Sequence, residues 1–429
     1  MHSSHSEATH PVTRWLESTS PAILTVYAVV VSFTTYFCMY AFRKPFSAAS
    51  YESLDDGSGI EWKTAFVVSQ VIGYTISKYM GIKVCAELPR EKRAAGLFAL
   101  IGIGFAALFF FAVLPPRGKV VAIFVNGLPL GMVWGLIVTF LEGRRTSEMM
   151  MAGLSCSYIL ASGVVKDVGR WLMSAHQVSE FWMPFTTGLV FLPVFIISVY
   201  GLSLVPKPDA ADERERHERT EMDGKERSAF AGRFLWGLVM LLILYFFLTA
   251  FRDFRDNFGV EMFEQLGLGD QSAIFSRAEL PVAFGVLIVF AALTFVRDNR
   301  RGFLVCYGIM LTGLAIVAGA TGMLQLGRID GLSWMIAIGF GSYLAYVPFG
   351  SVLFDRLMAY TRAPGTAVFA IYLCDAVGYT GSTALMLSKD ALFADVSRLD
   401  FFIGYCWFTS AIGSVLFVAS AVFFVRRTK

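Results

Sequence analysis

Three cations stand out because the sequence around them is apolar. Arg43, Lys78 and Arg252 lie within long apolar runs or at their ends. If these runs cross a membrane, a charge at the bilayer centre costs about 2.5–3.5 kcal/mol, so residues of this kind usually have a function. A guanidinium group offers fork-like pairs of donors to phosphate or carboxylate oxygens. We therefore predict that the three cations bind a small anion; the alternative is that each extends from a helix end to the lipid headgroups.

Two acidic residues lie in similar surroundings. Asp375 is near the middle of an apolar run, and Glu279 precedes Pro281 in another. A carboxylate inside a membrane can take up a proton, balance a nearby cation, or hold helices together through a buried ion pair. The sequence leaves these roles open, and we treat Asp375 and Glu279 as candidate coupling or counter-ion residues.

Aromatic and charged neighbours extend this set. Tyr40 and Tyr74 are close in sequence to Arg43 and Lys78, so we expect them to line the same cavity, although tyrosine is also common at membrane interfaces. A separate group lies toward the end of another apolar run and comprises Lys166, Asp167 and Arg170. Because residues three or four apart share a helix face, we interpret this group as a local charge cluster at the outer mouth of the protein.

The elements that must position these residues are membrane-spanning helices. The chain has 429 residues, of which 56 % are hydrophobic and 16 % are charged, whereas a soluble domain is about one quarter charged. Apolar runs recur along its whole length and match the length of a helix that crosses a bilayer. We predict an all-α membrane protein with twelve spans, near residues 22–42, 64–84, 94–114, 119–141, 149–173, 182–205, 234–252, 273–296, 302–322, 331–354, 364–388 and 401–425. The glycines of GLPLGMVWG and GFGSYLAYVPFG, in the fourth and tenth spans, are typical of close helix packing.

The chain divides into two related halves. Tyr36 to Arg43 reads YFCMYAFR and Tyr245 to Arg252 reads YFFLTAFR, so five of eight positions agree. Each segment lies in the first span of a group of six. Parallel six-span repeats build the major facilitator fold, whose substrate site lies between the halves near the middle of the membrane. We therefore expect two pseudo-symmetric six-helix bundles, with Arg43 and Arg252 facing one central, solvent-filled pocket.

The domain boundaries and the orientation follow from the charged loops. We predict a first half over 1–205, a charged cytoplasmic linker over 206–233 and a second half over 234–429. The linker is dense in charges of both signs, which is typical of a solvated segment. Lys and Arg gather in the loops that share a side with both termini, so both termini are expected in the cytoplasm. We expect a multi-pass monomer in the lipid bilayer of a plasma membrane such as the bacterial inner membrane.

Several other classes of protein are disfavoured. The net charge is only +3 and no continuous basic face is evident, so we expect no nucleic-acid partner. The six cysteines contain no CxxC pair and the five histidines lie in tails or loops, so we expect no metal site and no cofactor. No constellation of catalytic residues occurs at a useful spacing, so the chain is not expected to be an enzyme. The polar N-terminus lacks the pattern of a cleaved signal peptide.

The first two spans resemble the organophosphate:phosphate antiporter family of the major facilitator superfamily, which includes glycerol-3-phosphate and hexose-phosphate transporters. Members typically carry Tyr-x-x-Arg-Lys-x-Phe at the end of span one, and Ser-Lys followed by Gly in span two. The matching residues here are Tyr40, Arg43, Lys44, Phe46, Tyr74, Ser77, Lys78 and Gly81. The resemblance implies that Arg43 and Arg252 bind a phosphate group and that Lys78 assists them. Two departures indicate a divergent relative: Cys85 replaces the aspartate of the superfamily loop after span two, and the fifth span lacks the histidine of some members.

Taken together, these features predict a secondary active transporter of a small anionic solute, phosphorylated or carboxylated. It would work by alternating access, in exchange for phosphate or coupled to protons. One alternative is a transport-deficient membrane sensor of a phosphorylated metabolite, with the charged linker as its docking surface. Another is a carrier of the same fold for a non-phosphorylated organic solute, which the many Phe and Met residues would suit.

Overall fold

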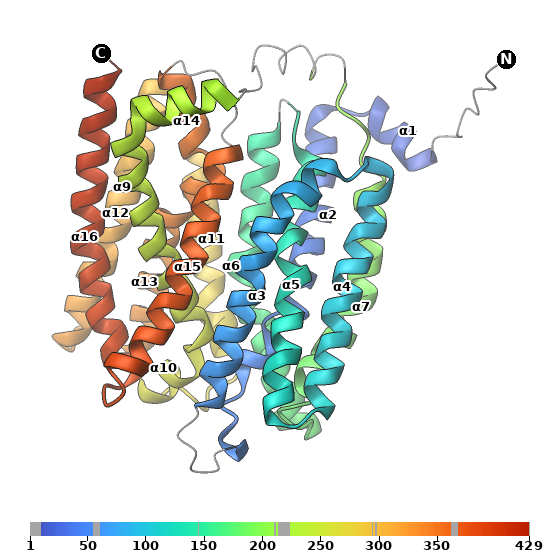
Figure 1. Ribbon diagram of the computed structural model, residues 1–429, viewed down its shortest axis with the longest axis vertical. Coiled ribbons are helices and arrows are strands. Elements are labelled where there is room, and N and C mark those ends of the chain that lie inside the picture. The colour runs from blue at the N-terminus through green and yellow to red at the C-terminus, as the bar shows by residue number, and fades with distance from the viewer. Residues whose placement is uncertain are drawn as a thin grey trace.

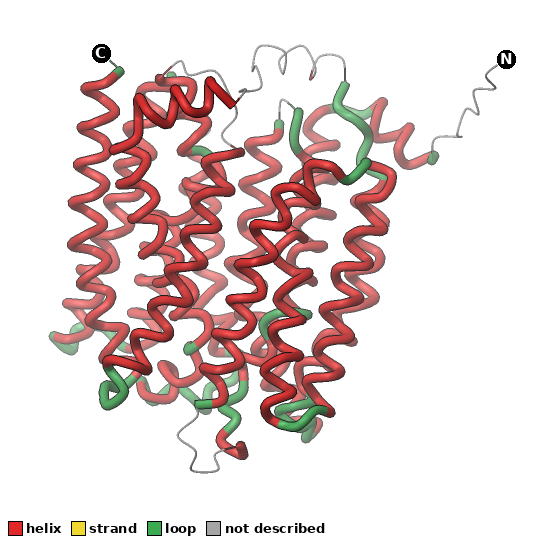
Figure 2. The backbone as a smooth tube through the Cα atoms, in the orientation of Figure 1, coloured by secondary structure: helices red, strands yellow, loops and turns green. Residues whose placement is uncertain are grey.

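The computed structural model describes residues 10–54, 61–144, 146–209, 212, 224–293, 295–296, 298–361 and 368–428. Over these residues the regular structure is helical, with no strand (Figure 2). Helices suit a membrane because each satisfies its own backbone hydrogen bonds, which lipid cannot do. The described part of the chain thus has the all-α architecture predicted from the sequence.

Twelve helices of 20 residues or more make up the body of the described chain. In the first half they are α2 (Pro21–Ala41), α3 (Trp62–Glu87), α4 (Arg90–Val113), α5 (Pro116–Leu141), α6 (Ser147–His176) and α7 (Met183–Ser203). In the second half they are α9 (Gly224–Asn257), α11 (Ile274–Leu293), α12 (Asn299–Gln325), α13 (Gly331–Ser351), α15 (Val368–Leu392) and α16 (Arg398–Arg427). Ten of them are long and apolar enough to cross a membrane, and the other two, α3 and α15, carry Lys78 and Asp375. The twelve predicted spans are confirmed to within a few residues, except that α9 begins at 224, inside the predicted linker.

Shorter helices complete the fold. They are α1 (Pro11–Ser18), the 3₁₀ turns η1 (Pro45–Ala48) and η2 (Glu52–Leu54), α10 (Gly259–Gln265) and α14 (Leu353–Thr361). Most of the predicted linker, over 210–211 and 213–223, lies outside the described residues. The predicted boundaries of the linker therefore remain a prediction.

The long helices form two bundles that pack in the same way. In the first bundle, α2 packs against α6 and α7, and α4 packs against α5 and α7. In the second bundle, α9 packs against α15 and α16, and α12 packs against α13 and α16 in the same pattern. The main helix contacts between the bundles are α3 with α15 and α6 with α11 (Figure 1). When each helix is replaced by its counterpart in the other bundle, the first contact becomes the second. This is the two-fold pseudo-symmetry of the major facilitator fold.

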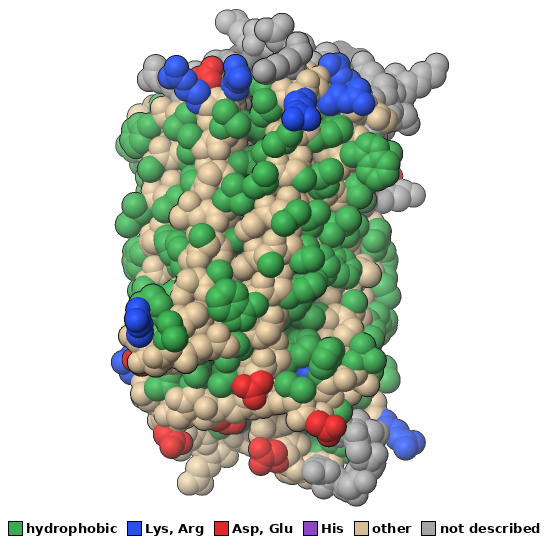
Figure 3. Space-filling model, turned by 90° about the vertical axis from the view of Figure 1, so that its left-hand side faces the viewer, with side chains coloured by type: hydrophobic (Ala, Val, Ile, Leu, Met, Phe, Trp, Pro, Cys, Tyr) green, Lys and Arg blue, Asp and Glu red, His purple; other side chains and the backbone are tan. Residues whose placement is uncertain are grey.

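The two ends of this helical body differ in charge. One end, here called the terminal end, carries α1, α14 and the last turn of α16, and the opposite far end carries η1 and α10 (Figure 1). On the face formed around α16, Lys and Arg side chains gather at the terminal end and acidic side chains at the far end, with hydrophobic side chains between them (Figure 3). This pattern is that of a multi-pass membrane protein with a basic side and an acidic side.

Helix α2 ends just before the two cations that follow it. Its last residue is Ala41, and Pro45 begins η1, because proline lacks an N–H and cannot continue a helix. The N–H groups of Arg43 and Lys44 still donate to the carbonyl of Tyr40, at 3.0 and 2.8 Å. All four residues of η1 are buried, so the break does not bring the chain to the surface. The two cations are consequently held inside the protein at a turn.

Two buried amide side chains stabilise this turn. Gln70 Nε2 donates to the carbonyl of Arg43 at 2.8 Å, and Asn126 Nδ2 donates to the carbonyl of Phe42 at 2.9 Å. Gln70 Nε2 also donates to Asn126 Oδ1 at 2.7 Å, which joins α3 to α5. Because buried carbonyls that lose their helical partners need other donors, these amides fix the backbone from which Arg43 extends.

Several of the glycines predicted to permit close packing do so, whereas a Cβ on Gly350 would meet no atom within 4 Å. A Cβ on Gly127 of α5 would lie 2.4 Å from the carbonyl oxygen of Gln70 in α3. Gly313 and Gly341 approach each other in the same way, since a Cβ on either would lie within 2.4 Å of the carbonyl oxygen of the other. Helices α12 and α13 therefore touch through their backbones, as membrane helices do at small residues.

Candidate functional site

A group of charged and tyrosine residues lies where the two bundles meet. We call it the central cluster, and it consists of Arg43, Lys78, Arg252, Asp253, Asp375, Ser382 and the tyrosines Tyr40, Tyr74, Tyr245, Tyr346 and Tyr379. Its members come from the end of α2, the turn after it and α3 in the first bundle, and from α9, α13 and α15 in the second. Five of the sequence-predicted residues, Arg43, Lys78, Arg252, Tyr40 and Tyr74, lie in this cluster with Asp375.

Of the three cations in the central cluster, Arg43 is the one whose charge is not balanced by an ion pair with a described carboxylate. Its side chain is buried, with the residue only 1 % exposed, and its guanidinium carbon lies 3.7 Å from the centre of the Tyr74 ring. Its Nε atom is buried without a hydrogen-bond partner. Among the described residues, no carboxylate lies within ion-pair distance of Arg43. The guanidinium group is thus held mainly by an aromatic face, which contributes about 2 kcal/mol when desolvated.

Arg252 is paired within its own helix. Its Nε and Nη2 atoms donate to Asp253 Oδ1 at 3.1 and 2.8 Å. Its other donors reach the hydroxyl oxygens of Tyr346 and, at 3.1 Å, of Tyr379. Asp253 also accepts a hydrogen bond from Ser382 at 2.8 Å. The charge of Arg252 is therefore balanced by an adjacent carboxylate that is itself fixed by α15.

Lys78 and Asp375 form an ion pair between the bundles. Lys78 Nζ lies 3.0 Å from Asp375 Oδ2. The other oxygen of this carboxylate accepts a hydrogen bond from the hydroxyl of Tyr245 at 2.7 Å. Both side chains are largely buried, with exposures of 5 % and 14 %. Of the roles left open for Asp375, the one visible in this conformation is that of a counter-ion for Lys78.

One tyrosine lies against both arginines. The centre of the Tyr379 ring is 5.9 Å from the guanidinium carbon of Arg43 and 5.6 Å from that of Arg252. The same ring lies 4.8 Å from the ring of Tyr74. The repeat-related arginines are therefore brought into one cluster across the bundle interface. Arg43 is buried among aromatic rings and the Arg252 side chain is only 11 % exposed, so neither lies in the open, solvent-filled pocket that the sequence led us to expect.

Tyr40 and Tyr74 occupy different positions around Arg43. Tyr74 stacks directly on the guanidinium group, whereas the ring of Tyr40 is 5.9 Å away and packs edge-on against Tyr36. The ring of Tyr36 in turn packs against Trp134. The first bundle thus supplies an aromatic wall on one side of the cation.

Glu279 belongs to a neighbouring pair. Its Oε1 atom accepts a hydrogen bond from Arg255 Nη1 at 2.6 Å, and Arg255 also donates to the carbonyl of Met335. The second carboxylate oxygen of Glu279 is buried without a partner. Glu279 is therefore the counter-ion of Arg255 in the second bundle, and it makes no ion pair with Arg43, Lys78 or Arg252.

Toward the far end, ion pairs join the bundles. Lys44 Nζ lies 2.5 Å from Asp256 Oδ2, and Lys166 Nζ lies 2.6 Å from Asp256 Oδ1. Lys44 also donates to Asn257 Oδ1 at 2.9 Å. Two lysines of the first bundle thus hold one carboxylate of the second. The interpretation of Lys166 and its neighbours as a purely local cluster was incorrect, because a sequence shows helix faces but not the helix that will oppose them.

Further contacts between the bundles lie at the same end. Asp167 accepts hydrogen bonds from the N–H groups of Phe275 and Ser276 at the start of α11. Lys63 pairs with Glu261 at 2.6 Å. Charged contacts of the same kind join Arg170 to the carbonyl of Gly269 and Arg398 to Glu61. The far end of the interface is consequently closed by polar contacts.

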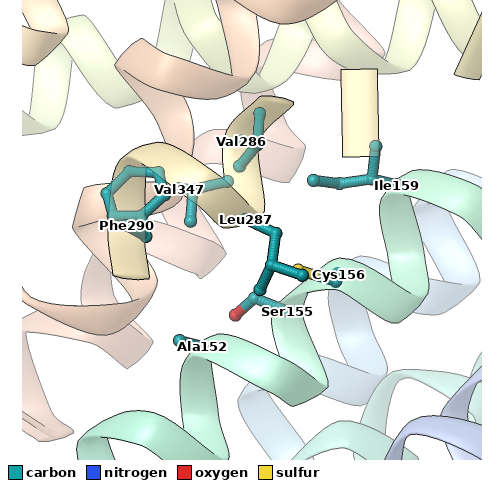
Figure 4. Close-up of a pocket in the computed structure, with 8 residues that line it drawn as sticks. All are labelled: Ala152, Ser155, Cys156, Ile159, Val286, Leu287, Phe290 and Val347. Atoms are coloured by element: carbon teal, nitrogen blue, oxygen red, sulfur yellow. The ribbon is translucent and has the colours of Figure 1, made fainter. Parts of the chain in front are cut away.

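One part of the interface, away from these charges, is apolar. A small cavity of about 10 Å³ lies between α6 and the pair α11 and α13, and it is lined by Ala152, Ser155, Cys156, Ile159, Val286, Leu287, Phe290 and Val347 (Figure 4). Its lining carries no charged side chain, and its walls belong to different bundles. Separating the bundles at this cavity breaks only apolar contacts, whereas separating them at the far end leaves charged groups that must find new partners.

Some members of the central cluster were missed in the sequence. Tyr379 and Ser382 were missed although they lie four and seven residues after the predicted Asp375 on α15, so the three share one helix face, and this spacing was a usable signal. Tyr245 was visible only as a member of the repeated segment. Within the described residues, no group of three His, Cys, Asp or Glu side chains could hold a metal ion.

Comparison with known proteins identifies a family and a fold. The sequence model described as "Family of unknown function (DUF5690)" matches residues 45–427. No curated protein matches the chain by sequence. These comparisons support a transporter fold and not membership of the organophosphate:phosphate antiporter family, so that resemblance rests on the motifs of the first two spans.

Solved structures with the same fold include two transporters. The crystal structure of a D-xylose-proton symporter matches with a TM-score of 0.61 and 14 % identity, over 94 % of this chain and 97 % of that one. The nucleoside transporter NupG matches with a TM-score of 0.60 and 13 % identity, over 92 % of this chain and 98 % of that one. At this identity the likeness establishes the major facilitator fold and not a substrate.

Proposed function

This chain belongs to DUF5690, a family of unknown function, and we propose that it is a secondary transporter that moves a small anionic solute by alternating access. The negative group of the solute, a phosphate or carboxylate, binds between Arg43 and Arg252, next to Lys78. The observation that carries this proposal is the state of Arg43, whose guanidinium is buried with no carboxylate partner among the described residues and with an unpartnered Nε atom.

The charges of the central cluster favour an anion over a neutral solute. Its two acids are already engaged, Asp253 by Arg252 and Asp375 by Lys78. Arg43 is left as a buried cation with no ion-pair partner among the described residues, and a negative group that approaches it would be stabilised. A phosphate or carboxylate between the two guanidinium groups would supply that charge and accept their paired donors.

The distribution of contacts between the bundles supports alternating access. The far end is held by ion pairs that include Lys44 and Lys166 with Asp256, whereas the cavity between α6, α11 and α13 is apolar. Rocking of the bundles would open the terminal side first, and exchange of the far-end ion pairs for water would open the other side. By the positive-inside rule we place the terminal end, with both termini, in the cytoplasm of a plasma membrane.

The ion pair between Lys78 and Asp375 provides a route for coupling. A solute that draws Lys78 away leaves Asp375 without its cation, and a proton can then neutralise the carboxylate. If instead Lys78 remains on Asp375, the arginines alone bind the solute, and exchange for inorganic phosphate needs no proton. Flux that depends on a pH gradient distinguishes the first case from the second.

Proteoliposomes that contain the purified protein test the proposal. Vesicles loaded with phosphate are offered a panel of labelled phosphorylated and carboxylated metabolites, and uptake is measured for the wild type, Arg43→Gln and Arg252→Gln. We expect both variants to lose uptake while keeping their helical content. Arg277→Gln is the matched control, because Arg277 is a far-end arginine that donates to Gln271 at the surface, away from the central cluster.

Unchanged uptake in both arginine variants would refute the anion site. Solute binding without flux in the wild type would favour the sensor over the transporter. Uptake restricted to uncharged sugars or nucleosides would assign the chain to the substrate classes named for its structural neighbours.

A further inference from the structure

A groove runs along the outer face of the second bundle near the terminal end. It lies between α9 and α16, encloses about 610 Å³, and is lined by Met240, Ala419, Val422, Phe423, Arg426 and Arg427. None of these residues belongs to the central cluster or to the interface between the bundles. The groove is therefore a second, separate feature of the molecule.

The lining residues of α16 form one continuous helix face. Ala419, Val422, Phe423, Arg426 and Arg427 follow the spacing i, i+3, i+4, i+7 and i+8, which is that of a single stripe along a helix. This stripe is roughly 12 Å long, given a rise of 1.5 Å per residue. Its first three members are apolar, and its last two are arginines in the final turn. The groove thus has an apolar floor and a cationic end.

The opposite wall is set by a close approach of α9. A Cβ on Gly237 would lie 2.6 Å from Cζ of Phe424, so the two helices touch at that point, and Met240 lines the groove three residues further along α9. Trp236 is 65 % exposed and lies one turn before Met240 on α9. Exposed tryptophan is typical of the boundary between membrane and water, so the arginines lie at the depth of the headgroups and the apolar floor at the depth of the acyl chains.

The two arginines have no acidic partner among the described residues. Both are exposed, and none of the described carboxylates lies within ion-pair distance of either. The guanidinium carbon of Arg427 lies 5.9 Å from the centre of the Phe423 ring, over the groove lining. Figure 3 shows this side of the molecule, with basic side chains at the terminal end above a hydrophobic surface.

We propose that this groove binds an anionic phospholipid. The headgroup phosphate binds Arg426 and Arg427, and an acyl chain lies along Met240, Ala419 and Val422. A zwitterionic lipid offers the same acyl chain but carries a positive group that the arginines repel. Because no described acid balances the arginines, the site selects lipids by net charge.

Native mass spectrometry of the full chain tests the selectivity. The purified protein is titrated with equal mixtures of phosphatidylglycerol and phosphatidylcholine of the same acyl composition, and bound lipid is counted. We expect one preferentially retained phosphatidylglycerol. In Arg426→Gln/Arg427→Gln its affinity falls roughly fivefold for each arginine removed, while phosphatidylcholine binding is unchanged.

Two variants make the result specific to the groove. Arg300→Gln/Arg301→Gln removes an adjacent arginine pair at the same end, on α12 and outside the groove, and it should retain the lipid. Ala419→Phe fills the floor and should release both lipid classes while leaving the arginines in place. Equal loss in the Arg300 and Arg301 variant would overturn the proposal in favour of general surface charge. Undiminished selectivity without Arg426 and Arg427, or lipid retention in Ala419→Phe, would also overturn it.

Discussion

The ammonium group of Lys78 lies 3.0 Å from the carboxylate of Asp375, 297 positions later in the chain, and this contact joins the two bundles. It pairs the charges of α3 and α15, the two long helices that do not belong to the ten most clearly apolar ones. Each charge lowers the free-energy cost of burying the other. The pair is thus both a structural link and the point where solute binding could release a carboxylate.

The first prediction concerns this ion pair. Lys78→Met or Asp375→Asn alone should lower the free energy of unfolding by about 3–5 kcal/mol, because each leaves one buried charge unpaired. The double variant should recover most of the loss, since no unpaired charge remains. Unfolding of all four proteins in detergent, analysed as a double-mutant cycle, measures the coupling. Losses that simply add would show that the two side chains do not interact.

The second prediction separates the ring of Tyr74 from its hydroxyl. Tyr74→Leu removes the aromatic face on which Arg43 lies and should cost about 2 kcal/mol of stability. Tyr74→Phe keeps that face and removes a hydroxyl that makes no hydrogen bond of normal geometry, so its stability should stay close to that of the wild type. Thermal unfolding of the two variants measures the contributions of the ring and of the hydroxyl separately. An equal loss in Phe and Leu would assign the effect to the hydroxyl.

The third prediction concerns closure of the far end. Asp256→Asn removes the carboxylate that holds Lys44 and Lys166, so conformers open at that end should become more populated. Spin labels at Ser174 and Asp270, in a background without native cysteines, report the separation of the bundles by pulsed electron resonance. The distance distribution should gain a longer component.

A matched acid tests whether this effect is specific. Asp330 is also at the far end, but it accepts a hydrogen bond from Ser333 within its own bundle. Asp330→Asn should leave the distance distribution unchanged. An identical response of both variants, or none in Asp256→Asn, would rule out a role of Asp256 in closure.

The fourth prediction compares glycines within α12. Gly313→Ala places a methyl group against the backbone of Gly341 and should destabilise the protein by about 1–3 kcal/mol. A Cβ on Gly319 would meet no other helix within 4 Å, so Gly319→Ala should stabilise α12 by about 0.5–1 kcal/mol. Unfolding of the two variants under the same conditions gives the comparison. The same sign of change in both would mean that helix propensity, not contact with α13, determines the effect.

The position of Arg43 illustrates how far sequence reasoning reaches. The proline after it predicted a break, and α2 does end at Ala41. The local sequence did not decide whether the arginine then extends to the headgroups or into the protein. Asn126 and Gln70, from other helices, hold the turn and direct the cation inward. A local pattern can place a break, but it cannot supply the distant amides that fix its geometry.

Glu279 and Lys166 also show that a local sequence pattern does not identify a partner on another helix. The periodicity of each helix gives the face on which a charge lies, yet Glu279 pairs with Arg255 and Lys166 with Asp256. These partners depend on how the helices dock, and many dockings are compatible with one set of faces. The burial of the central cluster was missed for the same reason.

The sequence by itself determined that the chain crosses a membrane as two repeats of six helices, because lipid demands long apolar segments whose backbones bond internally. It also determined that arginine follows the same aromatic segment in each repeat. Only the tertiary structure decided which cation is left without an acid, and which end of the interface the ion pairs close. These outcomes depend on distances between segments hundreds of residues apart, and such distances are set by helix packing rather than by any local preference.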